Sequence, residues 1–358
     1  MAIRAIHQVM TGAAPGSSTW GEARSVQAAL RGWGLRSDTY VGEAHAALRR
    51  ETIHFSEYRP QPGDVLLYHF TAASPLSDQV FAAGRPIILL YHNVTPARYY
   101  ANANPRVAAQ LARASEQLAT LRPQVRLALA HSEFSRRDLI AAGYEHTAVI
   151  PGLVSDTLIS AAPDVHVLAR FGGEGINLLA VGRLAPNKRP EDAVKALHAY
   201  RRIEPRARLF LAGASDNAER YVDWLHGCVE RLGLGDSVHF CGHVTDAQLA
   251  AYYRLAHVLI CMSEHEGFCI PLVEAMRFGV PILAFESSAI PETLGGAGVL
   301  IREKRYPIIA EVMHVLNTDA PFRDRVIARQ KTRAAEMEPS RTLAQLRTLI
   351  GVALEDTA

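Results

Sequence analysis

The sequence predicts an α/β protein of two domains, each built on a parallel β-sheet that helices cover. Three observations predict this class. Short β-branched apolar runs alternate with longer helical patterns, the alternation restarts after a glycine-rich segment, and 358 residues exceed the usual length of one domain. We expect the two domains to face each other across a central cleft, because open parallel sheets bind ligands at the carboxyl ends of their strands.

The composition indicates a globular protein without a nucleic-acid partner. Hydrophobic residues make up 49% and charged residues 21%, and the net charge of +2 is far from the basic excess of nucleic-acid-binding domains. No apolar run reaches the roughly 18 residues of a membrane span, and no signal region precedes the first predicted strand, so we expect a cytoplasmic protein. The cysteines show no C-x-x-C spacing, which favours free thiols over disulfides or a zinc site.

The first domain is expected over residues 1–155. A helix is predicted over residues 22–32, where Val26, Ala29 and Leu30 recur at helical spacing. Strands are predicted at residues 3–9, 38–41, 65–70, 86–94, 127–132 and 147–151.

Residues 156–175 are expected to form a linker, because this stretch contains Pro163 and a cluster of glycines. The second domain is expected over residues 176–335, and residues 336–358 carry a last amphipathic helix over 341–354. Strands of the second domain are predicted at residues 177–184, 207–213, 238–244, 258–263, 281–285 and 298–301, with helices at 190–202, 221–232 and 246–255.

Two cations follow the first strand of the second domain. This strand ends at Gly182, and Arg183 and Lys188 lie on the loop after it. A departing diphosphate needs positive charge at both phosphates, for which Arg offers a planar fork and Lys a compact charge. Two solvated surface cations would give the same pattern, so the pair alone leaves both interpretations open.

A second motif places two carboxylates around the start of a helix. Glu266 follows a buried strand, and Glu274 lies about one turn inside the next helix, so both are expected to face one cavity. The backbone amides of Phe268, Cys269 and Ile270 lie near the helix amino terminus, where anions bind. Glu274 could be only a favourable first-turn charge, but two acids beside a glycine and a proline favour a binding site.

A third motif is His92, at the end of a buried strand and beside Asn93. An isolated histidine is more often a core residue with a satisfied ring. The position at the end of a strand nevertheless favours a role in the cleft.

Taken in order, these motifs resemble those of family 4 retaining glycosyltransferases, which have the GT-B fold. The E-x7-E element runs from Glu266 to Glu274 and the G-R-L-x3-K element from Gly182 to Lys188, followed by Ser288–Glu292. The resemblance covers nearly the whole chain. It implies two Rossmann-like domains facing across a central cleft, with the last helix packed on the first domain.

The resemblance also implies roles for the matched residues. Arg183 and Lys188 would bind the donor diphosphate, Glu266 the hydroxyls of the transferred sugar, and Glu274 the ribose. The backbone amides of Phe268, Cys269 and Ile270 would contact the sugar and the phosphate. Gly213 and Val244 would line the base pocket, and His92 would contact the donor sugar.

One loop departs from the family pattern. Many members carry a Gly-Gly pair after the first strand, where backbone amides approach the donor phosphate. Here the nearest counterpart is Gly21, at the start of the first helix. A phosphate contact and an ordinary helix-start glycine both stay open.

The resemblance implies transfer with retention of configuration. The chain contains no D-x-D motif, so we expect no metal and no other cofactor. The leaving phosphate would then take the proton of the acceptor on the same face. Glu266 is not expected to act as a nucleophile, because nothing in the sequence places a second carboxyl group about 5–5.5 Å away, as double displacement requires.

The expected partners are a nucleotide-sugar donor and a saccharide or lipid-linked saccharide acceptor, in surface polysaccharide or glycoconjugate synthesis. The stretch Tyr91–Pro96 resembles a branch that uses GDP-mannose, and UDP-glucose or another UDP-sugar stays open. Residues 1–155 contain 15 arginines and 11 acidic residues. This small positive excess is compatible with a peripheral contact with the cytoplasmic membrane face, which stays open. The alternatives are a sugar-nucleotide epimerase on a similar scaffold, a pyridoxal-phosphate phosphorylase and a non-catalytic nucleotide-sugar-binding subunit.

Overall fold

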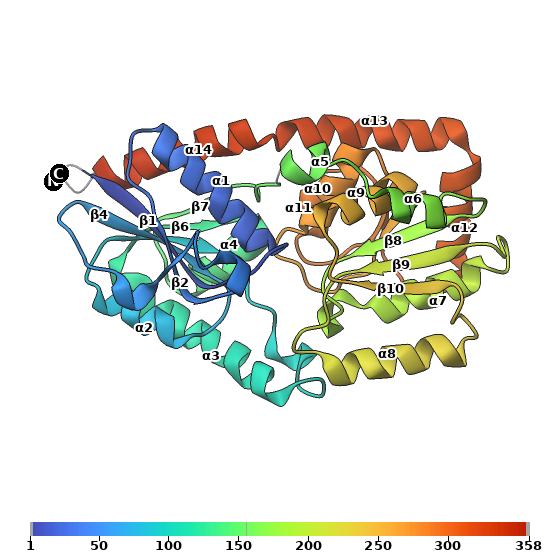
Figure 1. The fold of residues 1–358 in the computed structure, drawn as a ribbon, viewed down its shortest axis with the longest axis horizontal. Helices are drawn as coiled ribbons and strands as arrows, with labels where there is room; N and C mark the ends of the chain where they lie inside the picture. Colours follow the sequence, from blue (N-terminus) through green and yellow to red (C-terminus); the bar gives the residue numbers. More distant parts are fainter. Residues whose placement is uncertain (1–2, 155, 356–358) are drawn as a thin grey trace. The chain divides into compact units, whose positions relative to one another are not determined.

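The computed structural model describes residues 3–154 and 156–355. The chain divides into two compact units, and each contains one β-sheet (Figure 1). As far as they are described, residues 1–97, 106–155 and 337–358 form the first unit, and residues 98–105 and 156–336 form the second. The carboxyl-terminal end of the chain thus belongs to the same unit as the amino-terminal end.

The first unit contains a seven-stranded sheet in the order β3-β2-β1-β4-β5-β6-β7, and all its strand pairs are parallel. Since β2 and β4 lie on opposite sides of β1, the strand order reverses there, and such switch points create ligand sites at the strand carboxyl ends. The strands are β1 (Ala5–Ala13), β2 (Thr39–Ala44), β3 (Ile53–His54), β4 (Asp64–Phe70), β5 (Ile87–Tyr91), β6 (Val125–Ala130) and β7 (Thr147–Val149).

Side-chain caps begin several of the helices around this sheet. The Ser74 hydroxyl accepts from the amide of Leu76 at the start of α2, and the Ser132 hydroxyl accepts from that of Ser135 at the start of α4. The helices are α1 (Ser18–Gly32), α2 (Pro75–Ala82), α3 (Pro105–Leu121), α4 (Glu133–Ala141) and α14 (Pro339–Glu355), with 3₁₀ helices η1 (Ala46–Leu48), η2 (Phe55–Glu57) and η4 (Arg122–Gln124). The 3₁₀ helix η3 (Ala97–Tyr99) lies at the boundary, because residues 98–105 belong to the second unit.

Both faces of the first sheet are covered, which explains its continuously apolar strands. Successive residues of β4 alternate between two apolar clusters: Leu66 and Tyr68 belong to one, and Val65 and Leu67 to the other. The second cluster includes Leu346 of α14, which is 1% exposed. The last helix therefore completes the core of the first unit.

The second unit contains a six-stranded sheet in the order β10-β9-β8-β11-β12-β13, and its strand pairs are also parallel. Its switch point is at β8, between β9 and β11. The strands are β8 (Asn177–Val181), β9 (Arg208–Ala212), β10 (Val238–Gly242), β11 (Val258–Cys261), β12 (Ile282–Phe285) and β13 (Val299–Ile301).

The helices of the second unit also follow local signals. A capping box of Thr245 and Gln248 begins α9, and Gly279, with φ of 71°, ends α10. The helices are α5 (Asp156–Ser160), α6 (Val165–Phe171), α7 (Pro190–Tyr200), α8 (Glu219–Arg231), α9 (Asp246–Leu255), α10 (Ile270–Phe278), α11 (Ile290–Leu294), α12 (Tyr306–Thr318) and α13 (Ala320–Glu336), with the 3₁₀ helix η5 (Pro186–Lys188).

The segment expected to be a linker instead forms α5 and α6, both within the second unit. Asp164 begins α6 by accepting from the amides of His166 and Val167, and Phe171 packs 4.8 Å from the ring of Phe210. Pro163 and the glycines flank a short helix here. A proline and a glycine cluster at these positions are also typical of a linker, so the sequence pattern does not distinguish the two. The predicted strands all overlap observed ones, and only the two-residue β3 has no predicted counterpart.

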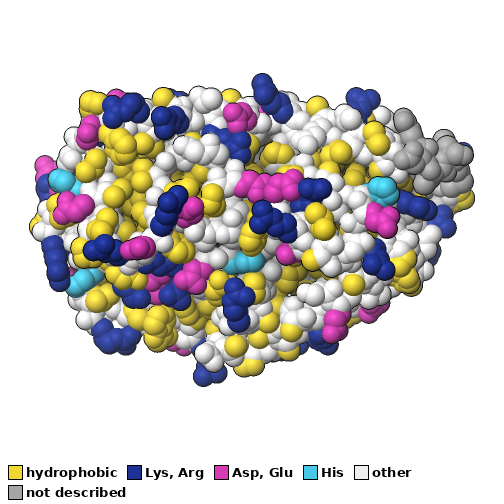
Figure 2. Space-filling view, turned by 180° about the vertical axis from the view of Figure 1, so that it is seen from behind, with side chains coloured by type: hydrophobic (Ala, Val, Ile, Leu, Met, Phe, Trp, Pro, Cys, Tyr) yellow, Lys and Arg dark blue, Asp and Glu magenta, His cyan; other side chains and the backbone are white. Residues whose placement is uncertain are grey.

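Within the described ranges, no helix combines the length and the apolar character that crossing a membrane requires. Figure 2 shows one face of the molecule, on which Lys and Arg side chains are interspersed with acidic and apolar ones. Charges of both signs therefore share this face.

Candidate functional site

In the second unit, two loops that carry predicted site residues follow neighbouring strands. The loop after β8 carries Arg183 and Lys188, and the loop after β11 carries Glu266. Because β8 and β11 pair in parallel, their carboxyl ends lie at the same edge of the sheet, at its switch point. Two motifs about 80 residues apart in sequence thus place their side chains at one edge of the sheet.

Lys188 and Glu266 form an ion pair. The Lys188 Nζ donates to both carboxylate oxygens of Glu266 at 2.6 Å, and the side chains are 25% and 7% exposed. Burial disfavours the charged ammonium, but the Glu266 carboxylate outweighs this effect, so the pKa of Lys188 is raised. Lys188 is therefore positively charged at neutral pH and is paired with a negatively charged carboxylate.

Arg183 is the exposed cation of the same loop. Among the residues that the structure describes, its side chain has no hydrogen-bond or ion-pair partner. A pocket beside it is lined by both loops and strand ends, including Gly182, Lys188, Cys261 and Ser263. A guanidinium with uncommitted donors can bind a phosphate through two parallel hydrogen bonds.

Asn187 joins the two loops and was not among the residues predicted for the site. Its side-chain Nδ2 donates to the backbone carbonyl of His265 at 3.1 Å, and its backbone carbonyl accepts from the amide of Glu264 at 2.8 Å. Since these contacts flank the Lys188–Glu266 pair on both loops, Asn187 sets how the pair meets. Its only sequence signal is its place beside Lys188, because a loop asparagine usually serves a local turn.

Two further cations near this site are committed to carboxylates. Lys304 Nζ donates to Asp192 at 2.7 Å and to Glu264 at 2.8 Å, and Arg189 Nε lies 3.1 Å and 3.3 Å from the same two groups. These pairs tie the start of α7 to the loop after β11. Lys304 and Arg189 thus serve the architecture of the site and are not available to a ligand as Arg183 is.

The turn before α10 has an unusual backbone. Cys269 caps this helix with φ of 74°, a left-handed conformation that is uncommon outside glycine. The carbonyl of Phe268 accepts from the Thr293 hydroxyl, which holds the turn. Because α10 begins at Ile270, the amides of this turn lie at a helix amino terminus, which favours an anion. The thiols of Cys261 and Cys269 are free and their sulfurs lie 3.8 Å apart.

Glu274 pairs with a tyrosine. Its Oε2 accepts from the hydroxyl of Tyr253 on α9 at 2.7 Å. Burial raises the pKa of Glu274 to about 7, and the tyrosine hydrogen bond opposes this rise only in part. No hydrogen bond or ion pair joins it to Glu266 in the described part of the chain. The two carboxylates therefore differ, since one is paired with a lysine and the other is close to half-protonated at neutral pH.

Gly213 and Val244 lie further along the same sheet edge, after β9 and β10. A Cβ on Gly213 would lie 1.9 Å from the carbonyl oxygen of Gly182, so the approach of these strand ends alone requires a glycine. Val244 is half-buried. The order of the strands places both residues on the side of β8 that is opposite β11.

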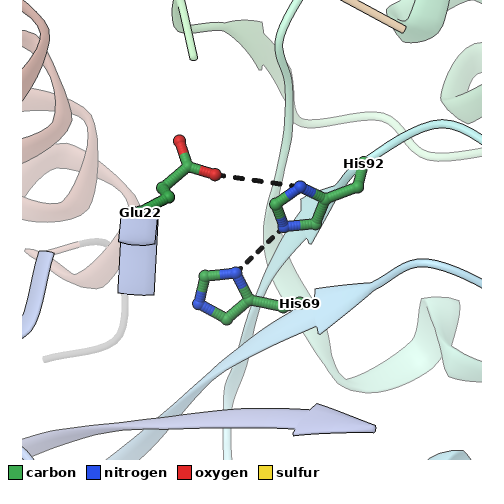
Figure 3. A group of neighbouring side chains, drawn as sticks. All are labelled: Glu22, His69 and His92. Atoms are coloured by element: carbon green, nitrogen blue, oxygen red, sulfur yellow. Dashed lines mark hydrogen bonds and ion pairs between the residues drawn. The ribbon is translucent and has the colours of Figure 1, made fainter. Parts of the chain in front are cut away.

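In the first unit, α1 and the ends of β4 and β5 bring together Glu22, His69 and His92 (Figure 3). His92 Nε2 lies 2.9 Å from His69 Nδ1, and His92 Nδ1 lies 3.7 Å from Glu22 Oε2. His131, which follows β6, lies 3.2 Å from the same oxygen of Glu22. Only His92 was selected from the sequence, because the other three residues carry no motif and meet it only through the order of the strands.

Burial and charge divide this cluster into two parts. Burial lowers the pKa of His69 to about 3 and the pKa of His92 well below its ordinary value. Burial also opposes charge on Glu22 and His131, but each stabilises the other, so the pKa of Glu22 is lowered and that of His131 is raised. The cluster thus holds one ion pair and two neutral histidines.

Gly21 lies in the first turn of α1, and its amide donates to the carbonyl of Ser17 at 3.0 Å. A Cβ at Gly21 would have no neighbour within 4 Å. Packing within the described chain therefore does not require a glycine at this position.

Two groups of side chains could supply ligands to a metal ion. In each, one atom per residue lies within 4.8 Å of the others: Glu22, His69 and His92; and Cys261, Glu266 and Cys269. Protein partners engage part of each group: Lys188 binds both oxygens of Glu266, and His92 Nε2 is hydrogen-bonded to His69.

The site of the second unit lies in a region shared with known proteins. The family model described as "Glycosyl transferases group 1" matches residues 170–333. This part of the chain is therefore similar to group 1 glycosyltransferases. This match confirms the predicted relationship for this part of the chain, which includes all the residues of the second-unit site described above. Gly21 and His92 lie outside the matched range.

Two curated relatives that match part of the chain are named for mannosyl products or donors. Mannosylfructose-phosphate synthase of Agrobacterium fabrum is 34% identical over 147 residues, which is 40% of this chain and 31% of the relative. GDP-mannose:cellobiosyl-diphosphopolyprenol alpha-mannosyltransferase of Xanthomonas campestris is 32% identical over 171 residues, which is 46% of this chain and 43% of the relative. The chain thus spans less than half the length of either protein.

The fold of the whole chain is similar to that of a solved structure. The crystal structure of Anabaena Alr3699/HepE in complex with UDP and glucose matches with a TM-score of 0.77 and 19% sequence identity, covering 97% of this chain and 99% of that one. Together with the two parallel sheets, this likeness confirms the predicted GT-B fold.

Proposed function

We propose that this protein transfers a hexose from a nucleotide-sugar donor to a saccharide or lipid-linked saccharide acceptor, with retention of configuration and without a metal. One observation carries the proposal: at the β8/β11 switch point, an uncommitted Arg183 lies in the same pocket as Lys188, which a buried carboxylate keeps charged. The similarity to group 1 glycosyltransferases supports this chemistry.

The two cations would stabilise the diphosphate as it leaves. Charge develops on the phosphate when the glycosidic bond breaks, and preorganised donors aimed at that charge lower the barrier. Arg183 would bind two phosphate oxygens, and Lys188 would add a point charge held in place by Glu266. The backbone amides of Phe268, Cys269 and Ile270, at the amino terminus of α10, would donate hydrogen bonds to the sugar and the phosphate.

The carboxylates would recognise hydroxyl groups. An ionised carboxylate only accepts hydrogen bonds, so Glu266 suits the hydroxyls of the transferred sugar and Glu274 those of the ribose. Gly213 and Val244 would line the base pocket. In the first unit, His92 would contact the transferred sugar and the amide region of Gly21 the donor phosphate.

Retention would follow from attack on the face that the leaving group vacates. The C–O bond to the phosphate breaks as the acceptor oxygen bonds to the sugar, and the acceptor proton passes to the departing phosphate oxygen. Because Lys188 engages Glu266 through both oxygens, we assign Glu266 to binding and not to nucleophilic attack.

We propose mannose as the sugar, with GDP-mannose as the donor. The names of two relatives support mannosyl transfer, while the UDP and glucose bound to HepE support a UDP-sugar instead. The diphosphopolyprenol in one of these names supports a lipid-linked acceptor, used in polysaccharide or glycoconjugate synthesis at the cytoplasmic face of a membrane.

Thermal shift with GDP, UDP and ADP, followed by product analysis with the matching nucleotide sugars, tests the proposal. A nucleotide at 100 times its dissociation constant should stabilise the protein by about 2.7 kcal/mol. We expect a shift with GDP and sugar transfer that chelators do not reduce. Isomerised donor without acceptor would instead indicate an epimerase, and binding without turnover of any donor a non-catalytic subunit.

Arg183→Ala tests the cation site directly. Because the side chain has no partner in the described structure, its removal should leave the melting temperature unchanged and lower turnover by about 10²–10³. Lys331→Ala is the matched control, since Lys331 is exposed on α13. Unchanged turnover in Arg183→Ala would reject the diphosphate assignment.

A further inference from the structure

A line of five polar side chains passes through the first unit and includes His92. Four of the five are buried, and His92 keeps 12% of its side chain exposed. In order along the line they are Gln8, His69, His92, Glu22 and His131, from β1, β4, the end of β5, α1 and the end of β6. His92 is therefore the member best placed to meet a ligand.

The orientation of Gln8 is fixed at one end of this line. Its Nε2 lies 2.6 Å from the carbonyl oxygen of Ala23, which can only accept a hydrogen bond. The amide nitrogen of Gln8 must therefore face Ala23, and its Oε1 must face His69 Nε2 at 2.9 Å.

The orientation of Gln8 sets the protons on both histidines. Because Gln8 Oε1 only accepts, His69 carries its proton on Nε2 and is left with an unprotonated Nδ1. That Nδ1 lies 2.9 Å from His92 Nε2, so His92 must donate from Nε2. A neutral His92 then has its lone pair on Nδ1, consistent with the burial that lowers its pKa.

The other end of the line holds a carboxylate in its ionised form. His131 Nδ1 lies 3.2 Å from the carbonyl of Ile150, so it carries a proton there, and its Nε2 lies 3.2 Å from Glu22 Oε2. Glu22 Oε1 accepts from the amide of Leu153 at 3.2 Å. Glu22 is thus held as an acceptor on both oxygens.

Two acceptors consequently meet at the centre of the line. His92 Nδ1 and Glu22 Oε2 lie 3.7 Å apart, and neither has a proton to give the other (Figure 3). This separation is also longer than a hydrogen bond. His131 already faces this oxygen of Glu22, whereas the lone pair of His92 Nδ1 has no donor within the line. A hydroxyl of a sugar could donate to His92 Nδ1 and lie beside the Glu22 carboxylate.

We propose that His69, oriented by Gln8, is a positioning residue that fixes His92 in its Nε2–H tautomer, so that His92 Nδ1 and Glu22 together accept hydrogen bonds from hydroxyl groups of the substrate. The inference rests on the proposed function only for the identity of that substrate. His69 acts through His92, since His69 itself is fully buried.

Nitrogen-15 NMR of the histidine rings tests the tautomer without any enzymatic assay. In the wild-type protein we expect His92 protonated on Nε2 and unprotonated on Nδ1 at neutral pH, and His131 protonated on both nitrogens. In His69→Leu, His92 should lose this single tautomer. A wild-type His92 that is protonated on Nδ1 would overturn the proposal, whether or not the protein transfers sugar.

A double-mutant cycle tests the functional consequence. His69→Leu should lower the transfer rate about tenfold, as expected for the loss of one buried hydrogen bond. His69→Asn, which keeps an acceptor near the position of Nδ1, should recover most of that rate. When His92 is already Ala, His69→Leu should have no further effect on transfer. Losses that add in the double variant would overturn the proposal.

Two measurements separate this result from other causes. His146→Asn, at an exposed histidine, is the control for both stability and rate. Metal analysis of the purified protein addresses the other use of Glu22, His69 and His92. About one equivalent of zinc, lost in His69→Leu, would make these residues metal ligands and overturn the hydrogen-bond line. A wild-type protein without transfer activity would count against the proposed function alone, because the tautomer is read independently.

Discussion

At the scale of single residues, replacing either Lys188 or Glu266 alone leaves the other charged group without its partner. Truncating Lys188 leaves a buried carboxylate without its partner, which costs about 3–5 kcal/mol in fully buried pairs and less here, where the lysine is 25% exposed. A loss of turnover in a single variant would therefore combine chemistry with folding.

We predict that Lys188→Ala lowers both the melting temperature and turnover. Adding Glu266→Gln should restore the melting temperature, because the unpaired charge is gone, but not turnover, because the cation and the sugar-binding carboxylate are then both missing. Differential scanning fluorimetry and a transfer assay on the single and the double variant check this prediction. Recovery of turnover together with stability would show that Lys188 acts only on folding.

Glu274 makes a pH-dependent prediction, because its pKa is raised to about 7 in the free protein. Ribose hydroxyls that donate to this carboxylate favour the ionised form, so binding lowers the pKa and releases protons. Nucleotide affinity should rise, by at most tenfold per pH unit, as the pH is raised toward 7, and level off above it. Calorimetry in buffers of different ionisation enthalpy measures the released protons.

Glu274→Gln is the control for this pH dependence. The terminal phosphate of a nucleoside diphosphate also titrates near pH 6, and that contribution stays in the variant. The difference between wild type and Glu274→Gln therefore belongs to the carboxyl group. Identical pH profiles would show that Glu274 does not ionise on binding.

At the scale of elements, two helical glycines separate stability from function. A Cβ added at Gly21 in α1 or at Gly351 in α14 would meet no other atom within 4 Å. Alanine at either position should stabilise the fold by about 0.5–1 kcal/mol, because glycine loses more backbone entropy in a helix.

We predict that the two alanine variants differ in transfer. Gly21→Ala should lower turnover, because the proposed donor phosphate would approach the backbone there, whereas Gly351→Ala should leave turnover unchanged. Chemical denaturation measures the stability of each variant and donor saturation kinetics its turnover. If Gly21→Ala keeps full activity, this glycine only starts a helix.

At the scale of the whole molecule, the core of the first unit depends on the last helix of the chain. Leu346 of α14 is 1% exposed within a cluster that also contains Leu129 of β6, whereas Val352 of α14 is 61% exposed. Residues more than 200 positions apart thus stabilise one unit, while the second unit is built almost entirely from the chain between them.

We predict that Leu346→Ala destabilises the first unit by about 2–5 kcal/mol, the usual cost of truncating a buried leucine. Hydrogen exchange should become faster in β6 and stay unchanged in β8. Val352→Ala, on the same helix, should change neither the stability of the first unit nor hydrogen exchange in β6. Equal acceleration in both sheets would mean that the two units unfold as one.

Local patterns in the sequence determined much of the fold. Apolar runs predicted the positions of the strands, because parallel strands that are covered on both faces consist mainly of apolar residues. The same patterns misassigned residues 156–175, since α5 and α6 are too short to show a helical period between their flanking proline and glycines. The β8/β11 loop residues could be selected because charged side chains at strand ends are informative in themselves.

The sequence alone determined the α/β class, the order of the strands along the chain and the identity of Arg183, Lys188, Glu266 and His92. Tertiary structure decided that Lys188 and Glu266 share one charge, that Asn187 joins their loops, and that His92 stands in line with Gln8, His69, Glu22 and His131. The physical reason is the order of strands in the sheets. Neighbours in a parallel sheet are set by crossover connections, so the groups that share a proton or a charge lie far apart in the chain and meet only when the sheet is assembled.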